Sequence, residues 1–268
     1  MDEMDKRFVF KERELRIEDL VFRLGADFAW DEWKSAPEDC FLMFKTRGLL
    51  EHFDAFFASK LDFRPQNIFE IGIWDGGSTA YWFEYFNAQK IVAVDHLDRE
   101  DSGYFRRYVE SRKLADRVKT YWGVNQGDSR RLLEIVGNEF EEPLDLVIDD
   151  GSHLPEETKT SFETLYPLLR PGGIYVIEDW NWELMPEARS PGHHWASTEG
   201  LVSLVTDLMR LTGAHALPVM TVYPNFVGVD KGVRLEGNSF DVDAQVSALP
   251  QKLERPDTTA LHVSGGGS

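Results

Sequence analysis

Five short apolar runs, rich in β-branched residues, alternate with amphipathic stretches through the middle of the chain. Such runs predict buried strands, and the stretches between them have the apolar spacing of helices. Regular alternation of this kind favours a parallel sheet wound by crossover helices. The predicted strands are Asn67–Ile73, Lys90–Asp95, Val118–Trp122, Leu144–Asp150 and Gly173–Asp179, with helices at Thr79–Asn87, Asp101–Lys113, Ser129–Gly137 and Pro155–Leu169.

The pattern changes after the fifth strand. Thr198–Thr212 is amphipathic and predicts a further helix. Ala216–Tyr223 and Phe226–Asp230 flank Pro224-Asn225, a pair that favours a tight turn, so we expect an antiparallel hairpin at one sheet edge. The whole pattern predicts an α/β fold with a mostly parallel, seven-stranded sheet and an antiparallel C-terminal hairpin.

The ends of the chain are expected to differ from this middle part. Residues 1–66 are rich in Phe, Trp and charge without a clear strand pattern, and we interpret them as a helical cover over the open edge of the sheet. Residues 67–250 then form the α/β domain. Residues 251–268 are polar, end in Ser-Gly-Gly-Gly-Ser, and predict a flexible tail.

Composition narrows the class of protein. With 268 residues, of which 42% are apolar, the chain can bury a full core. It has no apolar run of about 18 residues and carries acids near its start, so we expect a cytoplasmic protein that binds no membrane. A single Cys40 excludes an internal disulfide.

The formal net charge is −18, from 47 acidic and 29 basic residues. Such a charge repels nucleic acid unless a basic patch stands out. Pairs such as Arg106-Arg107 and Arg130-Arg131 fall on predicted helices and are interpreted as solvated faces. We therefore expect no nucleic acid partner and a neutral or cationic small-molecule substrate.

Two of the predicted strands end in paired acids, Asp149-Asp150 and Glu178-Asp179. The carboxyl ends of parallel strands share one edge, so four carboxylates would meet there and need a cation. Oxygen ligands favour Mg²⁺, and His153, just beyond the first pair, has the chemistry of a general base. Neighbouring side chains of a strand point to different sides, so not every acid can be a ligand. We choose Asp150, Glu178 and Asp179, because the chain is leaving regular strand geometry at those positions, and leave Asp149 a supporting role.

The first strand runs into a glycine-rich turn, Glu70-Ile-Gly72-Ile-Trp-Asp-Gly76-Gly-Ser78, that opens a helix. Glycines let a ligand approach the backbone closely, but the Gly-x-Gly-x-x-Gly spacing of dinucleotide-binding turns is missing. Asp95 ends the second strand, where a carboxylate can accept the hydroxyls of a ribose.

Together these residues resemble class I S-adenosylmethionine-dependent methyltransferases, which have a Rossmann-like, doubly wound fold. The resemblance implies that Glu70 and the backbone from Gly72 to Ser78, including Gly76, lie along the methionine part of the donor. Asp95 would hold the ribose. Asp128 would lie near the adenine amino group or, alternatively, cap the following helix. Arg47 is the expected partner of the donor carboxylate.

The stretch from Asn67 to Trp180 resembles one subgroup more closely, the metal-dependent sugar O-methyltransferases of the macrocin and mycinamicin type, with cephalosporin hydroxylase-like relatives. The shared motifs are Asp149-Asp-Gly-Ser-His153 and Glu178-Asp179. The resemblance implies Mg²⁺ held by Asp150, Glu178 and Asp179, with His153 as the base. It also implies a homo-oligomer, although the N-terminal part is too short for the large auxiliary domain of some members.

After the fifth strand comes a long loop that contains Trp182, His193, His194 and Trp195. Loops beside a catalytic edge are commonly lids, and aromatic walls suit sugar rings or flat acceptors. We expect the two tryptophans to line an acceptor pocket, with plain packing of the loop onto the sheet as the alternative. The histidines could serve as a second proton carrier; adjacent residues rarely reach one metal ion together.

Three functions remain open at this point. The first is a Mg²⁺- and S-adenosylmethionine-dependent O-methyltransferase acting on a vicinal diol, on the sugar of a macrolide-like, glycosylated natural product of an antibiotic pathway. The second keeps the chemistry but takes a catechol-type or other polyketide acceptor. The third is a donor-binding, hydroxylase-like component without methyl transfer.

Overall fold

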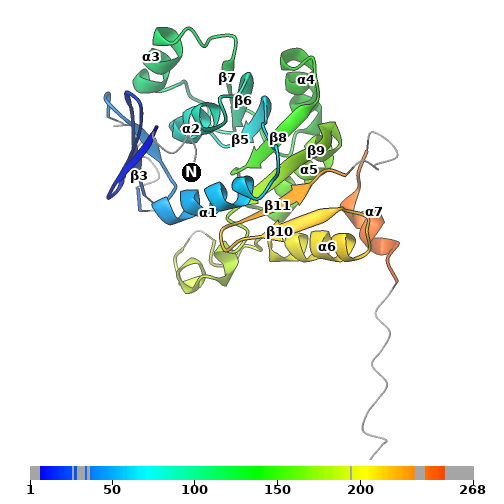
Figure 1. The fold of residues 1–268 in the computed structure, drawn as a ribbon. Helices are drawn as coiled ribbons and strands as arrows, with labels where there is room; N and C mark the ends of the chain where they lie inside the picture. Colours follow the sequence, from blue (N-terminus) through cyan, green and yellow to red (C-terminus); the bar gives the residue numbers. More distant parts are fainter. Residues whose placement is uncertain are drawn as a thin grey trace, which may run out of the picture.

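A computed structural model describes residues 7–25, 27–28, 34, 37–193, 195–232 and 239–250. These residues form a sheet of seven strands in the order β10-β11-β9-β8-β5-β6-β7 (Figure 1). Strands β9, β8, β5, β6 and β7 run parallel to one another, and β11 runs antiparallel to both of its neighbours, β9 and β10. This confirms the predicted sheet and hairpin. Their bounds are β5 Asn67–Ile71, β6 Lys90–Asp95, β7 Val118–Trp122, β8 Leu144–Asp149, β9 Leu169–Glu178, β10 Val219–Val222 and β11 Phe226–Asp230.

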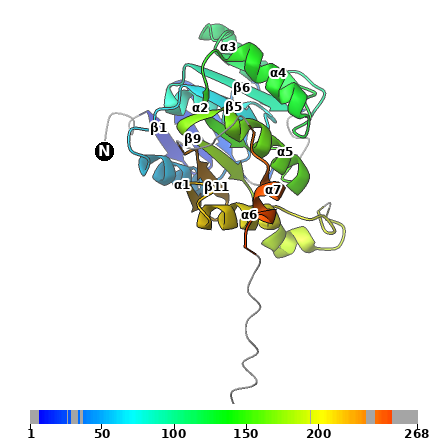
Figure 2. The same cartoon turned by 90° about the vertical axis from the view of Figure 1, so that its right-hand side faces the viewer.

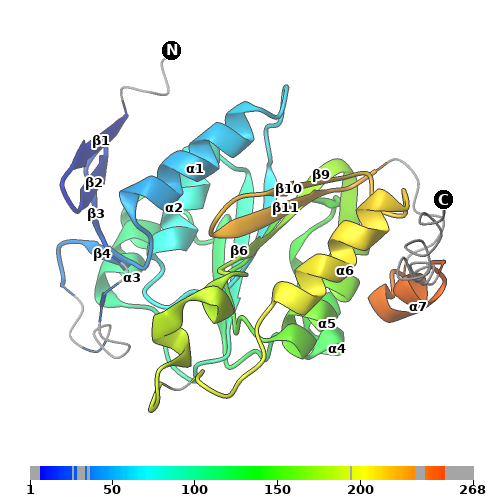
Figure 3. The same cartoon turned by 90° about the horizontal axis from the view of Figure 1, so that it is seen from below.

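Helices cover both faces of this sheet (Figure 3). Successive side chains of a strand point to opposite faces, so Leu146 and Ile148 of β8 join one apolar cluster while Val147 joins the other. The first face is covered by α1 Arg47–Ala58, α2 Gly77–Phe86 and α3 Gly103–Ser111, and the second by α4 Ser129–Glu139, α5 Pro155–Leu165 and α6 Val202–Gly213.

The predicted helices are present with shifted ends. The helix predicted at Pro155–Leu169 corresponds to α5, which ends earlier, at Leu165. A single 3₁₀ turn over Tyr166–Leu168 follows it. A short α7, Val242–Ser247, lies near α6 (Figures 1 and 2). The expected tail, residues 251–268, lies outside the described residues. Within the described part, no helix is long and apolar enough to cross a membrane.

The expectation of a purely helical N-terminal cover is wrong. Helix α1 is present, but it is preceded by a four-stranded sheet of β1 Phe8–Lys11, β2 Glu14–Ile17, β3 Leu20–Leu24 and β4 Phe41–Met43. These strands are short, and two of their tight turns place Glu12 and Glu18 at positive φ. Glycine or asparagine usually marks such turns, so the sequence carried no turn signal there.

This small sheet packs against helices instead of covering the sheet edge, as Figure 1 shows. Phe22 of β3 meets Tyr81 of α2 edge-on at 6.4 Å, and Phe41 of β4 meets Tyr104 of α3 at 4.6 Å. Helix α1 lies on the large sheet, where the rings of Phe53 and Phe226 stack with centroids 4.1 Å apart. The N-terminal part therefore shares one core with the α/β domain.

Strand β5 lies between β8 and β6, where the order of the strands reverses direction along the chain. Open α/β sheets bind ligands at this point, beyond the carboxyl ends of the strands. The turn after β5 passes close to the end of β8. Gly72 has φ +99°, and a Cβ there would lie 2.1 Å from the carbonyl oxygen of Asp150, so only glycine fits.

The packing of α1 on β11 can be tested at Gly228, where an added Cβ would lie 2.3 Å from the buried Phe56 ring. We expect Gly228→Ala to lower the free energy of unfolding by about 1–3 kcal/mol, because overpacking forces neighbours to move. Gly137→Ala in α4 is the control: its Cβ meets nothing within 4 Å, and alanine favours a helix interior. Urea unfolding measures both, and an equal response of the two variants would contradict this packing.

Candidate active site

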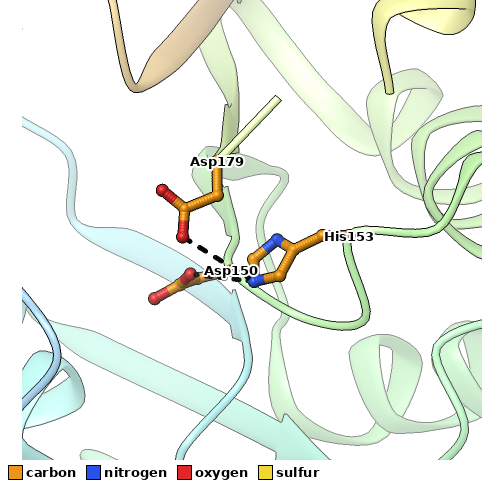
Figure 4. A group of neighbouring side chains, drawn as sticks. All are labelled: Asp150, His153 and Asp179. Carbon is orange, nitrogen blue, oxygen red and sulfur yellow. Dashed lines mark ion pairs between the residues drawn. The ribbon is translucent and has the colours of Figure 1, made fainter. Parts of the chain in front are cut away.

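Three side chains converge at the carboxyl edge of the sheet (Figure 4). Asp150 follows β8, His153 lies in the next loop, and Asp179 follows β9. The Nε2 atom of His153 is 3.8 Å from Asp150 Oδ1 and 4.0 Å from Asp179 Oδ2. One donor atom from each residue lies within 4.8 Å of the other two. The structure thus brings three of the four predicted metal and base residues together, with donor atoms that suit a divalent cation.

Two of these residues have an unusual backbone. His153 has φ +55° and Asp179 has φ +50°, the left-handed region that non-glycine residues rarely adopt. Neighbours hold both in place: Trp182 Nε1 donates to the His153 carbonyl at 3.1 Å, and the Asp179 amide donates to the Asn225 carbonyl at 2.6 Å. Strain of this kind gathers at functional sites, where the surrounding structure enforces it.

Lys45 also belongs to this site, although the sequence analysis did not predict it as a site residue. Its Nζ atom donates to both oxygens of Glu178, at 2.6 and 2.7 Å, and to Asp150 Oδ2 at 2.8 Å. The side chains of Lys45 and Glu178 are each only 1% exposed. Burial alone would lower the pKa of Lys45, but the carboxylates of Asp150 and Glu178 outweigh it and raise that pKa above its usual range.

This pairing gives Glu178 a different partner from the one expected. Glu178 was predicted to bind the metal beside Asp150 and Asp179, but in this structure both of its oxygens accept hydrogen bonds from Lys45. The sequence offered one hint: Lys45 directly follows four apolar residues, Phe41 to Phe44, an uncommon place for an exposed lysine.

Arg47 is placed elsewhere. It begins α1, pairs with Glu51 at 2.7 Å, and lies over the ring of Phe10 at 5.1 Å. More than half of its side chain is exposed. Arg47 thus contacts Glu51 and Phe10 in this structure, and its role as partner of the donor carboxylate stays a prediction.

Glu70 is fully buried at the end of β5. The Thr79 hydroxyl donates to its Oε2 atom, while no described residue hydrogen-bonds Oε1. Burial raises the pKa of Glu70 to about 7, and the Thr79 hydroxyl partly opposes that rise. A buried oxygen without a partner costs free energy, so this carboxylate suits a ligand that brings a donor group.

Asp95 shapes the glycine-rich turn. Its Oδ2 atom accepts from the amides of Ile73 and Trp74, at 2.9 and 3.0 Å, and its Oδ1 atom accepts from Leu97 at 2.9 Å. A carboxylate has about four lone-pair sites, so these three bonds leave about one for a ribose hydroxyl. Asp95 thus has a structural role, and its part in holding a ribose stays a prediction.

Three further residues were predicted to bind S-adenosylmethionine: Asp128 before α4, and Gly76 and Ser78 at the start of α2. Asp128 Oδ1 accepts from the Arg131 amide at 3.0 Å and caps α4, which confirms the capping alternative. At Gly76, φ is +81° and a Cβ would lie 2.3 Å from the Phe105 ring, so glycine is needed for packing against α3. Ser78 is buried in the first turn of α2, a helix without a side-chain N-cap.

A buried hydrogen-bond network supports the loop that carries His153. Asp149 accepts from Gln126 Nε2, the Ser161 hydroxyl and the Tyr175 hydroxyl, each at 2.7 Å. Gln126 Oε1 in turn accepts from the Ser152 amide at 2.9 Å. Burial raises the pKa of Asp149 to about 6, and the two hydroxyls oppose that rise. Asp149 has the supporting role expected of it, whereas nothing in the sequence singled out Gln126.

The loop after β9 brings two tryptophans toward the site. The rings of Trp182 and Trp195 are 4.5 Å apart, and Trp195 meets His153 edge-on at 6.0 Å. Trp182 is buried, which fits the alternative that it packs the loop onto the sheet. Trp195 is the tryptophan whose ring lies beside the imidazole of His153. His193 lies 5.9 Å from Trp195, and His194 is outside the described residues.

Comparison with known proteins finds methyltransferases among the relatives of this chain. Residues 69–180 match a family described as a methyltransferase domain. Demethylmacrocin O-methyltransferase of Streptomyces fradiae is 31% identical, over 74% of this chain and 53% of its own length. A tetracenomycin-pathway enzyme of Streptomyces olivaceus, 8-demethyl-8-(2-methoxy-alpha-L-rhamnosyl)-tetracenomycin-C 3'-O-methyltransferase, is 32% identical, over 80% of this chain and 54% of its own length.

A solved structure shows the same likeness. The MycE methyltransferase from the mycinamycin biosynthetic pathway, in complex with Mg and SAH, superposes with a TM-score of 0.51 at 29% identity. The match covers 68% of this chain and 49% of that chain. The chain spans about half the length of the curated relatives it matches. From its fold, its site and these matches, we conclude that the chain carries a class I methyltransferase domain similar to that of the sugar O-methyltransferases of macrolide and polyketide pathways.

Proposed function

We propose that the chain transfers the methyl group of S-adenosylmethionine to a hydroxyl of a metal-chelated diol, on the sugar of a glycosylated natural product. The observation that carries this proposal is the convergence of Asp150, His153 and Asp179 beside the glycine-rich turn. Relatives named for methylating macrocin precursors and rhamnosyl tetracenomycin support a sugar as the acceptor.

The donor fits the turn after β5 because it has an amino acid tail and a ribose but no phosphate. The unpartnered Oε1 atom of buried Glu70 can accept a hydrogen bond from the donor's ammonium group. Asp95 has about one lone pair left for a ribose hydroxyl. Asp128 would reach the adenine amino group with Oδ2, since its Oδ1 atom caps α4.

Asp150 and Asp179 would hold a divalent ion, with Glu178 as a further carboxylate once Lys45 releases it. When bound, Mg²⁺ would chelate the acceptor diol and stabilise the developing alkoxide. His153 then accepts the hydroxyl proton at Nε2. The hydrogen bond from Trp182 to its carbonyl and the ring of Trp195 fix this loop and help exclude water. Methyl transfer needs an in-line approach at about 3 Å, so orientation contributes much of the acceleration.

Removal of the metal tests this assignment first. After dialysis against EDTA, we expect methyl transfer to a glycosylated macrolide to fall to background and to return when Mg²⁺ is added, because the alkoxide loses its counter-charge. A stoichiometric assay with labelled S-adenosylmethionine measures this. Full turnover in EDTA would show that the reaction needs no metal.

Substitution of the proposed base separates sugar from phenol acceptors. We expect His153→Gln to lower kcat for a sugar hydroxyl by about 100-fold or more, since an aliphatic hydroxyl is poorly nucleophilic without a base. Calorimetry with S-adenosylhomocysteine should show unchanged donor affinity. A phenol needs less activation, so nearly unchanged turnover in this variant would favour a catechol-type acceptor instead.

Two further substitutions test how the site is divided. Asp150→Asn should abolish metal-dependent turnover while donor affinity stays within a few-fold, because Asp150 lies beyond β8 and the donor over β5 and β6. Asp95→Ala should weaken donor binding first, since it removes the acceptor of two amides of the glycine-rich turn, those of Ile73 and Trp74, and of the Leu97 amide after β6. Titration with S-adenosylhomocysteine measures both. Equal loss of donor affinity in the two variants would mean that donor and metal do not occupy separate halves of the site.

A further inference from the structure

We infer that the Lys45 ammonium is a built-in competitor of the divalent ion: it holds Glu178 and one oxygen of Asp150, and thereby sets how tightly the chain binds the ion. This inference rests on the proposed function, because it concerns the affinity of the same metal site.

The contacts of Lys45 are those of a bound cation. Three carboxylate oxygens surround its Nζ atom at 2.6, 2.7 and 2.8 Å, which uses all three hydrogens of the ammonium. Both oxygens of Glu178 are taken in this way. The three residues whose donor atoms already converge, Asp150, His153 and Asp179, do not include Glu178. For Glu178 to bind the ion, at least one of its bonds to Lys45 has to break.

The charges lead to the same conclusion. Asp150, Glu178 and Asp179 together carry three negative charges when ionised, and Lys45 supplies one positive charge among them. With Lys45 in place the group has a charge of −2, and without it −3. Charges at such short range in a buried site interact strongly, so loss of Lys45 strengthens the attraction for a divalent ion and frees the oxygens of Glu178.

The backbone on either side of Lys45 is held by hydrogen bonds that do not involve its ammonium. Its amide donates to the Met43 carbonyl at 2.7 Å, and the next residue, Thr46, caps α1. Strand β4 is tied to the glycine-rich turn by the bond from the Leu42 amide to Asp75 Oδ2, 2.8 Å long. The flexible four-carbon stem of lysine can therefore withdraw the charge while its anchor stays fixed.

Titration calorimetry with Mn²⁺, in the absence of donor and acceptor, tests this competition. We expect Lys45→Met, which keeps an unbranched flexible side chain, shorter by one atom, but removes its charge, to bind Mn²⁺ about tenfold more tightly or better. Lys60→Met is the matched control, since Lys60 Nζ contacts both oxygens of Asp230, at 2.7 and 2.8 Å, away from the site. Its affinity for Mn²⁺ should equal that of the unaltered chain.

A double variant shows whether the increase in Mn²⁺ affinity comes from the release of Glu178. In a Glu178→Gln background, Lys45→Met should give a much smaller increase in affinity, because the contested carboxylate is gone. If the unaltered chain binds Mn²⁺ and Lys45→Met binds it equally or more weakly, the competition is refuted, Lys45 acts as a support that orients Glu178, and the proposed function stands. If neither protein binds Mn²⁺, the proposed metal role fails and the inference with it.

A second measurement needs no substitution and so does not depend on the folding of a variant. Amine-reactive labelling of the unaltered chain, read by mass spectrometry, reports how accessible each lysine is. Adding Mn²⁺ should raise labelling at Lys45 several-fold, because the ion displaces the ammonium from its carboxylates, and should leave Lys60 unchanged. Labelling at Lys45 that stays the same or falls would contradict displacement.

Discussion

The buried carboxylates at the carboxyl edge of the sheet are the constraint on which the site depends. Glu178 lies almost wholly out of water, and Asp150 and Asp179 lie beside it, so the edge needs positive charge to remain folded. The chain supplies part of it from Lys45, which is 105 residues from Asp150 and 133 from Glu178 in sequence. The N-terminal sheet and α1 therefore do more than cover the domain, because the connection between them delivers this ammonium.

Several residues at this edge combine an observed structural role with a proposed functional one. Asp95 holds the amides of the glycine-rich turn and still has capacity for a ribose hydroxyl. Asp128 caps a helix with one oxygen. Gly72 permits the turn to touch the backbone of Asp150, which places the donor turn directly against the proposed metal ligands. The donor and metal halves of the site are thus joined by backbone contact, and we expect substitutions at this contact to affect both.

Local patterns predicted most of the domain because the parallel strands are continuous apolar runs that end in polar residues. Lys90–Asp95 and Val118–Trp122 were predicted with the bounds that the structure shows. The small sheet of β1 to β4 was missed because its strands are short and its turns use glutamate in place of glycine. Lys45 and Gln126 were missed for a different reason: their importance comes from contacts with residues far away in the chain, which no local pattern records.

In the proposed site, Asp150 and Asp179 bind a divalent ion beside His153 at the strand ends. Anomalous diffraction from a crystal soaked in Mn²⁺ tests it most directly, because it locates the ion independently of activity. We expect one strong peak in contact with both Asp150 and Asp179, at about 2.0–2.1 Å from their oxygens as for Mg²⁺ sites. A fully soaked crystal without a peak there, or with its main peak away from these residues, would contradict it.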